Sequence, residues 1–177
     1  MSFQPVHQVT RLPLSALSSY RDQKAAILNN GDLSPEGKKS HLDGASEPVR
    51  RALQEARGHL DKAQREARRK REAFSRPGFE ASNVEHALLH GEIRAHLKST
   101  KPADRTALLD SADINTLSAV LLAPCWLSGI SADLHDALRL QYAKRVHPDD
   151  WAVLLEQETT IAAASAELDA IATELPQ

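Results

Sequence analysis

The chain has a single cysteine, Cys125, among 177 residues, so a disulfide within the chain is excluded and a reducing compartment is expected. Aromatic residues make up only 4% of the sequence, which argues against a β-sandwich, because strands favour aromatic and β-branched side chains. No apolar run approaches the roughly 18 residues of a membrane-spanning helix. The N-terminal residues lack a basic segment followed by an apolar one, so we expect no secretory signal peptide.

The composition that remains favours helices. Alanine and leucine supply most of the 41% hydrophobic residues, charged residues make up 26%, and polar and apolar residues do not alternate as in strands. The net charge of -2 gives no general attraction to nucleic acid or membranes. We therefore predict an all-α protein. Residues 1–78 are expected to form a long kinked coiled coil or helical hairpin, and residues 79–177 a small helical bundle.

Two helices are predicted in the N-terminal half. The first runs from Leu14 to about Asn30, and its apolar residues at helical spacing are Leu14, Leu17, Ala25 and Leu28. The second restarts at Ser34-Pro35-Glu36, because Ser is a good N-cap, Pro suits the first helical position and Glu is favourable in the first turn. Pro48 lacks an N–H group, so we expect a kink or a break near residues 44–48.

A heptad pattern follows Pro48 in the second helix. Its members alternate at spacings of four and three, with Lys70 as the one polar member. They are Val49, Leu53, Ala56, Leu60, Ala63, Ala67, Lys70 and Phe74. Leu53 and Leu60 are therefore candidate interaction residues, either in a hairpin within the chain or in a coiled coil between subunits.

Shorter helices are predicted after Arg76-Pro77-Gly78, which marks the internal boundary. They cover residues 84–98, 103–111, 114–123, 131–146 and about 151–175. The apolar stripe expected on the last helix consists of Val153, Leu154, Ile161, Leu168, Ile171 and Leu175. The most apolar stretch, residues 119–130, is predicted to form the bundle core with Trp151. In the alternative, it is an exposed docking patch anchored by Trp126.

Charge is distributed unevenly along the chain. Residues 34–76 contain twelve Lys and Arg against seven Asp and Glu, whereas residues 146–177 contain seven Asp and Glu and no Lys or Arg. Opposite charges can pair within one molecule, or they can join neighbouring copies head to tail in a ring.

A basic cluster occupies part of the second helix. Its cations are Arg65, Arg68, Arg69, Lys70 and Arg71. Such a cluster can contact the phosphates of a nucleic acid or an acidic protein partner. A solvated helix face accounts for the same pattern, because acidic residues lie close by and no aromatic platform, zinc motif or helix-turn-helix pattern accompanies it.

His147-Pro148-Asp149 resembles the tripeptide of J-domain co-chaperones, which follows a basic helix and engages Hsp70. A helix with Arg139, Lys144 and Arg145 precedes it here. The sequence departs from that family, because the next helix is expected to begin at once, without the loop, and Tyr142 lies too near the tripeptide. A Pro-Asp pair between two helices is also an ordinary stop and cap.

The sequence contains no recognisable catalytic constellation. His86 and His90 are four residues apart and can hold zinc only with a third ligand, and His-Glu-x-x-His is not formed because Glu85 precedes His86. No nucleophile elbow, phosphate-binding loop or dinucleotide fingerprint occurs. Cys125 lies in an apolar stretch typical of a buried residue. We therefore predict no enzymatic activity, no cofactor and no metal.

Two further sequence features occur together in this chain. One is the helix restarted by Leu33-Ser34-Pro35-Glu36-Gly37-Lys38, and the other is Leu121-Leu122-Ala123-Pro124 with Leu127-Ser128-Gly129-Ile130-Ser131, then a helix broken at His147-Pro148. In these features the chain resembles small helical proteins encoded in the structural gene clusters of tailed bacteriophages and prophages. The resemblance covers most of the chain. It implies a structural role, portal-, connector- or capsid-associated, with no catalytic residue to carry over.

The resulting prediction is a non-catalytic structural or assembly protein, in a virion or in the bacterial host cytoplasm. We expect it to bind copies of itself and other structural proteins. We expect no association with a membrane. The alternative is a regulatory module that uses the basic cluster on nucleic acid or on an acidic protein. A third hypothesis is a J-domain-like co-chaperone.

Overall fold

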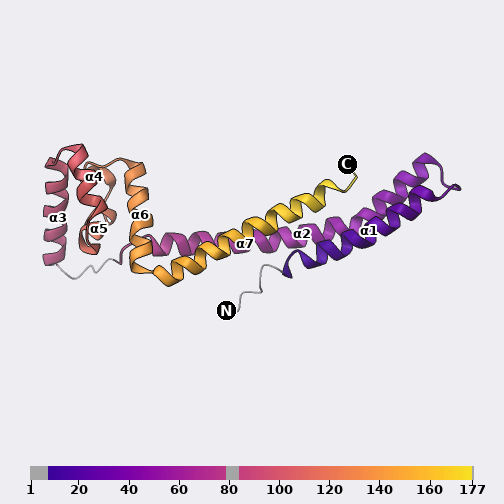
Figure 1. Ribbon diagram of the computed structural model, residues 1–177, viewed down its shortest axis with the longest axis horizontal. Helices are drawn as coiled ribbons and strands as arrows, with labels where there is room; N and C mark the ends of the chain where they lie inside the picture. The colour runs from indigo at the N-terminus through magenta and orange to yellow at the C-terminus, as the bar shows by residue number, and fades with distance from the viewer. Residues whose placement is uncertain (1–7, 79–83, 177) are drawn as a thin grey trace. The chain divides into compact units, whose positions relative to one another are not determined.

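The computed structural model describes residues 8–78 and 84–176, and within these ranges it contains helices and irregular segments but no strand (Figure 1). This confirms the predicted all-α class. The helices are α1 (Arg11–Asn29), α2 (Pro35–Phe74), α3 (Val84–Ser99), α4 (Pro102–Asp110), α5 (Ile114–Leu121), the 3-10 helix η2 (Cys125–Leu127), α6 (Ala132–Val146) and α7 (Pro148–Thr173). None of the described helices combines the length and hydrophobicity that crossing a membrane requires.

Contacts group the chain into two compact units. Unit 1 comprises residues 1–67 and 155–177, and unit 2 comprises residues 68–154. This grouping differs from the predicted boundary at residue 78, because the second part of α7 packs with the N-terminal helices. Both α2 and α7 are continuous helices that contribute residues to each unit.

In unit 1, α1 and α2 form a helical hairpin, and the C-terminal part of α7 lies beside α2 (Figure 1). Ser34 begins α2 as the sequence predicts, since its hydroxyl accepts a 3.1 Å hydrogen bond from the Gly37 amide. At the same end of the hairpin, Lys38 Nζ donates a 2.9 Å hydrogen bond to the Leu28 carbonyl of α1. The turn is therefore tied by contacts from both helices.

Opposite charges join α7 and the residue that follows it to the hairpin. Arg21 of α1 pairs with Glu174 at 2.5 Å, and Arg57 of α2 pairs with Asp169 at 2.9 Å. The pairing with Arg21 lowers the pKa of Glu174 below its ordinary value, mainly through the hydrogen bond. Two acidic residues near the C-terminus thus pair with arginines of the same molecule.

The heptad residues of α2 line the packed side of that helix in unit 1. The buried members are Val49, Leu53, Ala56, Leu60 and Ala67. On α7 in the same unit, the buried residues also recur at spacings of three and four, and they are Ile161, Ala164, Leu168 and Ile171. Val153, expected in the same stripe, is exposed, because the buried face passes through Leu154 and each residue turns a helix by about 100°.

The predicted apolar face of α1 is right at Leu17 and wrong at Leu14, Ala25 and Leu28. Leu14 and Leu28 are 41% and 50% exposed. The buried residues of α1 are Pro13, Leu17 and Tyr20. Lys24 continues that spacing, and its Nζ lies 5.8 Å from the centre of the Tyr20 ring. The packed face therefore contains a charged residue, which a search for apolar spacing passes over.

Pro48 does not break α2, so the predicted break is wrong. The helix is continuous through Pro48, although the proline ring removes the N–H group that would bond to the Gly44 carbonyl. The fully buried Ser46 donates from its hydroxyl to the Asp43 carbonyl at 2.8 Å. Packing of the fully buried Val49 in the next turn also favours the continuous helix, since tertiary packing overrides local propensity.

The core of unit 2 centres on α5, which packs against both α3 and α6. Its buried residues are Leu97, Leu109, Ala112, Leu117, Val120, Leu121, Ile130, Leu138 and Tyr142. Asp113 caps α5 by accepting a 2.7 Å hydrogen bond from the Thr116 amide, and this bond lowers the pKa of Asp113. Trp151 is only 4% exposed, which confirms its predicted burial.

Candidate interaction surfaces

The cations of the basic cluster do not share one environment. The exposed members are Arg65 in unit 1 and Arg68 and Arg69 in unit 2. The half-buried members are Lys70 and Arg71. Arg68 Nε lies 3.4 Å from Glu72 Oε1, and the Arg71 guanidinium lies 5.1 Å from the centre of the Trp151 ring. Part of the cluster is therefore engaged by neighbours within unit 2.

Leu53 and Leu60 are buried inside unit 1, with 5% and 3% of their surfaces exposed. Both side chains are therefore used in packing within the chain. Neither side chain is on a free surface of unit 1, which contains α1, most of α2 and the second part of α7.

Trp126 is the largest exposed side chain of its stretch, with 64% of its surface accessible. The prediction that residues 119–130 form the core is right for Val120, Leu121 and Ile130 and wrong for Trp126. The reason is the single turn of η2. Successive side chains of a 3-10 helix point about 120° apart, so they cannot all face the same core.

His147-Pro148-Asp149 forms the corner between α6 and α7. His147 is the C-cap of α6, and α7 begins at Pro148, so no loop separates the helices. The His147 ring lies 5.0 Å from the Phe74 ring, and its carbonyl accepts a 2.8 Å hydrogen bond from the Trp151 amide. Of the tripeptide, His147 is thus half-buried in this corner of unit 2, whereas Pro148 and Asp149 are exposed.

The paired histidines of α3 stack on each other. The rings of His86 and His90 are 6.3 Å apart. Burial, followed by the charges of Arg94 and His86, lowers the pKa of His90 below its ordinary value. Within residues 8–78 and 84–176, no three His, Cys, Asp or Glu side chains gather as a metal site would require.

Three arginines of unit 2 donate hydrogen bonds to backbone carbonyls of the same unit. Arg94, Arg105 and Arg145 each donate hydrogen bonds to carbonyls near the C-terminal ends of neighbouring helices. The last carbonyls of a helix have no partner within it. These guanidinium groups therefore stabilise the bundle.

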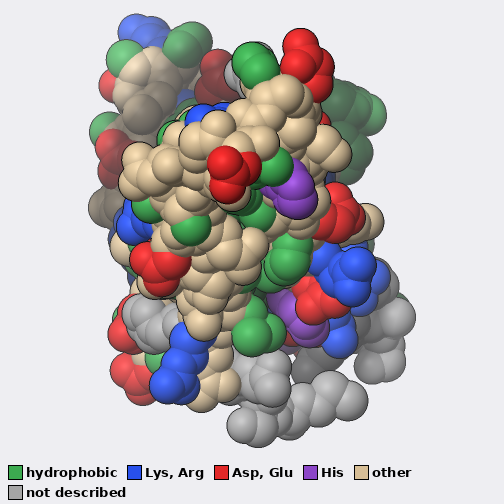
Figure 2. Space-filling view, turned by 90° about the vertical axis from the view of Figure 1, so that its right-hand side faces the viewer, with side chains coloured by type: hydrophobic (Ala, Val, Ile, Leu, Met, Phe, Trp, Pro, Cys, Tyr) green, Lys and Arg blue, Asp and Glu red, His purple; other side chains and the backbone are tan. Residues whose placement is uncertain are grey.

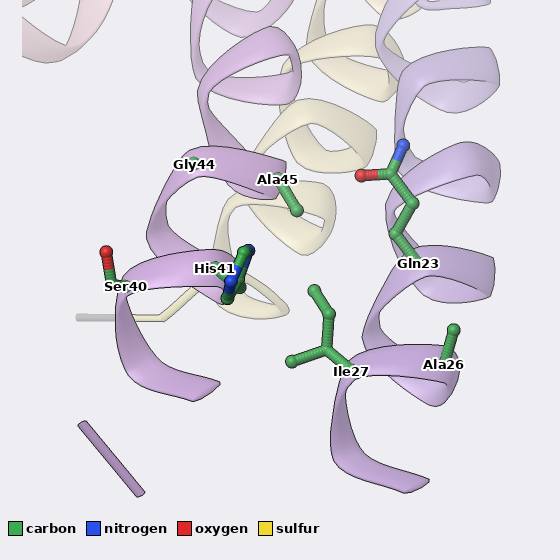
Figure 3. A pocket seen from close by; sticks show the side chains of 7 residues that line it. All are labelled: Gln23, Ala26, Ile27, Ser40, His41, Gly44 and Ala45. Atoms are coloured by element: carbon green, nitrogen blue, oxygen red, sulfur yellow. The ribbon is translucent and has the colours of Figure 1, made fainter. Parts of the chain in front are cut away.

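A groove between α1 and α2 is the feature that the sequence did not reveal. Near the turn it forms a hollow of about 450 Å³ in unit 1. Its lining residues are Gln23, Ala26 and Ile27 of α1 and Ser40, His41, Gly44 and Ala45 of α2 (Figure 3). Figure 3 shows the side chains of Ile27 and Ala45 pointing into the space between the two helices.

The hollow continues along the hairpin into a second one of about 580 Å³, which shares Gly44. This part is lined by Leu12, Ser15, Ala16, Ser19, Gly44, Glu47, Pro48, Arg51, Ala52 and Glu55. We call the two hollows together the α1–α2 groove. Apart from Leu12, which is 69% exposed, the α1 residues in this part are small. Small side chains let another helix approach closely.

The groove lies on the side of α2 that faces away from α7. Arg57 marks the α7 side through its ion pair with Asp169. Pro48, in the groove, is nine residues earlier, which is about half a turn around the helix at about 100° per residue. The α7 helix therefore leaves this side of the hairpin uncovered.

Charged residues alternate along one edge of the groove. Glu47, Arg51 and Glu55 are all exposed and follow one another at intervals of four residues. Within the described ranges, none of the three has an ion-pair partner. Figure 2 looks onto the hairpin end and shows acidic and basic side chains interspersed there, without a field of one sign.

Gly44 is the one local signal of the groove in the sequence. Glycine inside a helix costs about 1 kcal/mol relative to alanine. A Cβ atom added at Gly44 would meet no atom within 4 Å, so packing within the chain does not require a glycine there.

Comparison with known protein families, with curated proteins and with solved structures finds no match to this chain.

Proposed function

We propose that this chain is a non-catalytic assembly protein that acts by binding other protein chains through the α1–α2 groove. The observation that carries the proposal is the groove itself, which runs beside most of α1 and is not covered by α7. A groove between two helices is a common docking site for a further helix. The lack of a Cβ atom at Gly44 favours close approach of such a partner.

The setting we propose is a tailed bacteriophage or prophage, as a portal-, connector- or capsid-associated protein or an aid to particle assembly. The support comes from the sequence, through the helix restarted at Leu33-Ser34-Pro35-Glu36 and the later Leu127-Ser128-Gly129-Ile130-Ser131. A groove between two helices can receive a helix of another structural protein. The elongated α1–α2 groove fits that type of contact.

A binding experiment with two matched glycine variants tests the proposal. The chain is co-expressed with the proteins encoded beside its gene and isolated through an affinity tag. Gly44→Leu places a side chain in the groove, where there is open space in the free chain. We expect Gly44→Leu to reduce the bound partner by about tenfold or more, because a wedge in a helix–helix contact prevents close packing.

Gly58→Leu is the matched control for that experiment. Gly58 lies on the same helix, also has no atom within 4 Å of an added Cβ, and lines a hollow beside Ala172 and Leu175 rather than the α1–α2 groove. It should bind as the unmodified chain does. Equal capture of all three proteins, or no capture of any neighbouring gene product, contradicts the proposal.

The absorbance of the isolated complex separates this proposal from the alternatives. A ratio of absorbance at 260 and 280 nm typical of protein is expected for a protein assembly. A ratio typical of bound nucleic acid, lost in Arg68→Ala with Arg69→Ala, would instead favour the regulatory module. Stimulation of the ATPase of a bacterial Hsp70, lost in His147→Gln, would favour the co-chaperone hypothesis.

A further inference from the structure

The edge of the α1–α2 groove has a charge pattern that is complementary to itself. Along α2 it reads acid, base, acid at Glu47, Arg51 and Glu55. Read from the opposite end, the order is the same. When two such helices lie antiparallel and are shifted by one helical turn, each Arg51 faces an acidic residue of the other copy.

Unsatisfied charge at this edge strengthens the argument. Arg51 has no acidic partner within the part of the chain that the structure describes. By contrast, Arg57 on the α7 side of the same helix is paired with Asp169 at 2.9 Å. Arg57 beside α7 is thus paired within the chain, whereas Arg51 beside the groove is available to another chain.

The shape of the groove allows the same contact. Gly44 and Ala52 leave little side chain on α2 beside the charged residues, and Ser15 and Ser19 are small on the facing side of α1. A two-fold axis makes one surface meet its own copy, so a surface must complement itself in shape and in charge. The α1–α2 groove meets the condition on charge, and its small lining residues allow two copies to approach closely.

We infer that a second copy of this chain occupies the groove, with the two hairpins packed groove to groove about a two-fold axis. This inference rests on the proposed function and names the first partner of that site. The pairing joins α1 and α2 of each copy in a bundle of four helices. Arg51 of each copy then lies beside Glu47 or Glu55 of the partner subunit.

A charge-exchange experiment tests the inference on the full chain. Molar mass is measured by light scattering on a sizing column at several concentrations. We expect the unmodified chain to form a dimer that dissociates on dilution. We expect Arg51→Glu to weaken the dimer by about tenfold or more, because the new glutamate then faces an acidic residue of the other copy in both symmetry-related contacts.

The reverse variant, Glu47→Arg with Glu55→Arg, should also be weakened as a homodimer. Mixing it with Arg51→Glu should restore a dimer that contains one copy of each, because opposite charges then face each other again. Arg65→Glu is the control, since it makes the same change on the same helix at an exposed residue outside the groove. Circular dichroism melting of each variant shows that the helices remain folded.

Two results would overturn the inference. One is a monomer at every concentration, and the other is a dimer that Arg51→Glu leaves intact or that Arg65→Glu dissociates equally. Neither result decides the proposed function, which depends on whether Gly44→Leu removes a different protein partner. The two proposals therefore fail separately.

Discussion

Arg105 of α4 donates a hydrogen bond from its guanidinium to the carbonyl of Gly129, which follows η2. The same guanidinium donates to the Leu97 and Thr100 carbonyls at the end of α3, at 2.7 Å each. One side chain thus connects α4, the end of α3 and the turn before α6. The planar arrangement of donors on arginine suits this role, and a lysine has no equivalent.

We therefore expect Arg105→Ala to destabilise unit 2. Hydrogen bonds from a charged donor contribute about 1.5–3 kcal/mol, so the free energy of unfolding should fall by about 2–4 kcal/mol. Arg105→Lys should recover only a minor part of that loss. Urea unfolding followed by circular dichroism measures both. Arg69→Ala, at an exposed site, should change the free energy by less than about 0.5 kcal/mol, and an equal effect of the two alanine variants would refute the expectation.

Glycine substitutions should have opposite effects at two positions. Gly129 has φ +68°, and an added Cβ would lie 2.9 Å from Arg105 Nη1. Gly129→Ala should lower the free energy of unfolding by about 1–3 kcal/mol because of backbone strain and displacement of the guanidinium. Gly58→Ala, within α2 and facing open space, should raise it by about 0.5–1 kcal/mol. Thermal melting that shifts in the same direction for both variants would contradict this reasoning.

The two tryptophans should report different surroundings. In Trp151→Phe, the remaining Trp126 is exposed, so its fluorescence should be red-shifted and readily quenched by acrylamide. In Trp126→Phe, the remaining Trp151 is buried beneath Arg71, so its emission should be blue-shifted and protected. The same pair should differ in stability, with Trp126→Phe nearly neutral. Equal quenching of the two variants would show that η2 does not present Trp126 to solvent.

Stability should decline as the pH falls below the ordinary pKa of histidine. Burial lowers the pKa of His135, aided by the charge of Arg139, while Asp136 and a hydrogen bond to Ala123 act in the opposite direction. Its Nε2 atom is buried without a partner in the described structure, so protonation would create a charge with no acceptor there. The contribution of His135 to stability is therefore complete above about pH 6.5 and is lost as the pH falls towards the lower pKa of the folded state.

The measurement is the free energy of unfolding between pH 7.5 and pH 5, for the unmodified chain and for His135→Gln. The unmodified chain should lose stability over this range, and the loss should be smaller in the variant. His90 contributes in the same direction, because its pKa is also lowered. Identical pH profiles for the two proteins would show that His135 is not the group responsible.

Local sequence patterns were sufficient for much of the fold. The N-cap at Ser34, the heptad positions from Val49 to Ala67 and the buried Trp151 follow from spacing and from the chemistry of single residues. The packed face of α1 did not, because Lys24 is placed there by its contact with Tyr20 rather than by hydrophobicity. Pro48 was read as a kink or a break, and the break is wrong because a local rule gives no weight to the buried Val49 beside it.

The groove could not be predicted from local sequence patterns, and the cause is different. The side of α2 that stays exposed depends on where α7 packs. The sequence of α2 does not show which of its two sides α7 covers. Gly44 gave a hint, since a glycine in a helix needs an explanation, but glycine alone does not specify a partner. Trp126 was uncertain in the same way, because the direction of its side chain depends on the turn of η2.

The acidic composition of α7 has a practical consequence for proteolysis. Trypsin cleaves after Lys and Arg, and residues 146–177 contain neither. After cleavage at Arg145, α7 therefore remains one intact peptide however long the digestion continues. If the ion pairs of Asp169 and Glu174 hold the peptide on the hairpin, it remains bound to the hairpin after cleavage. If they do not, it dissociates. Trypsin therefore releases α7 as a single fragment that it cannot cleave further.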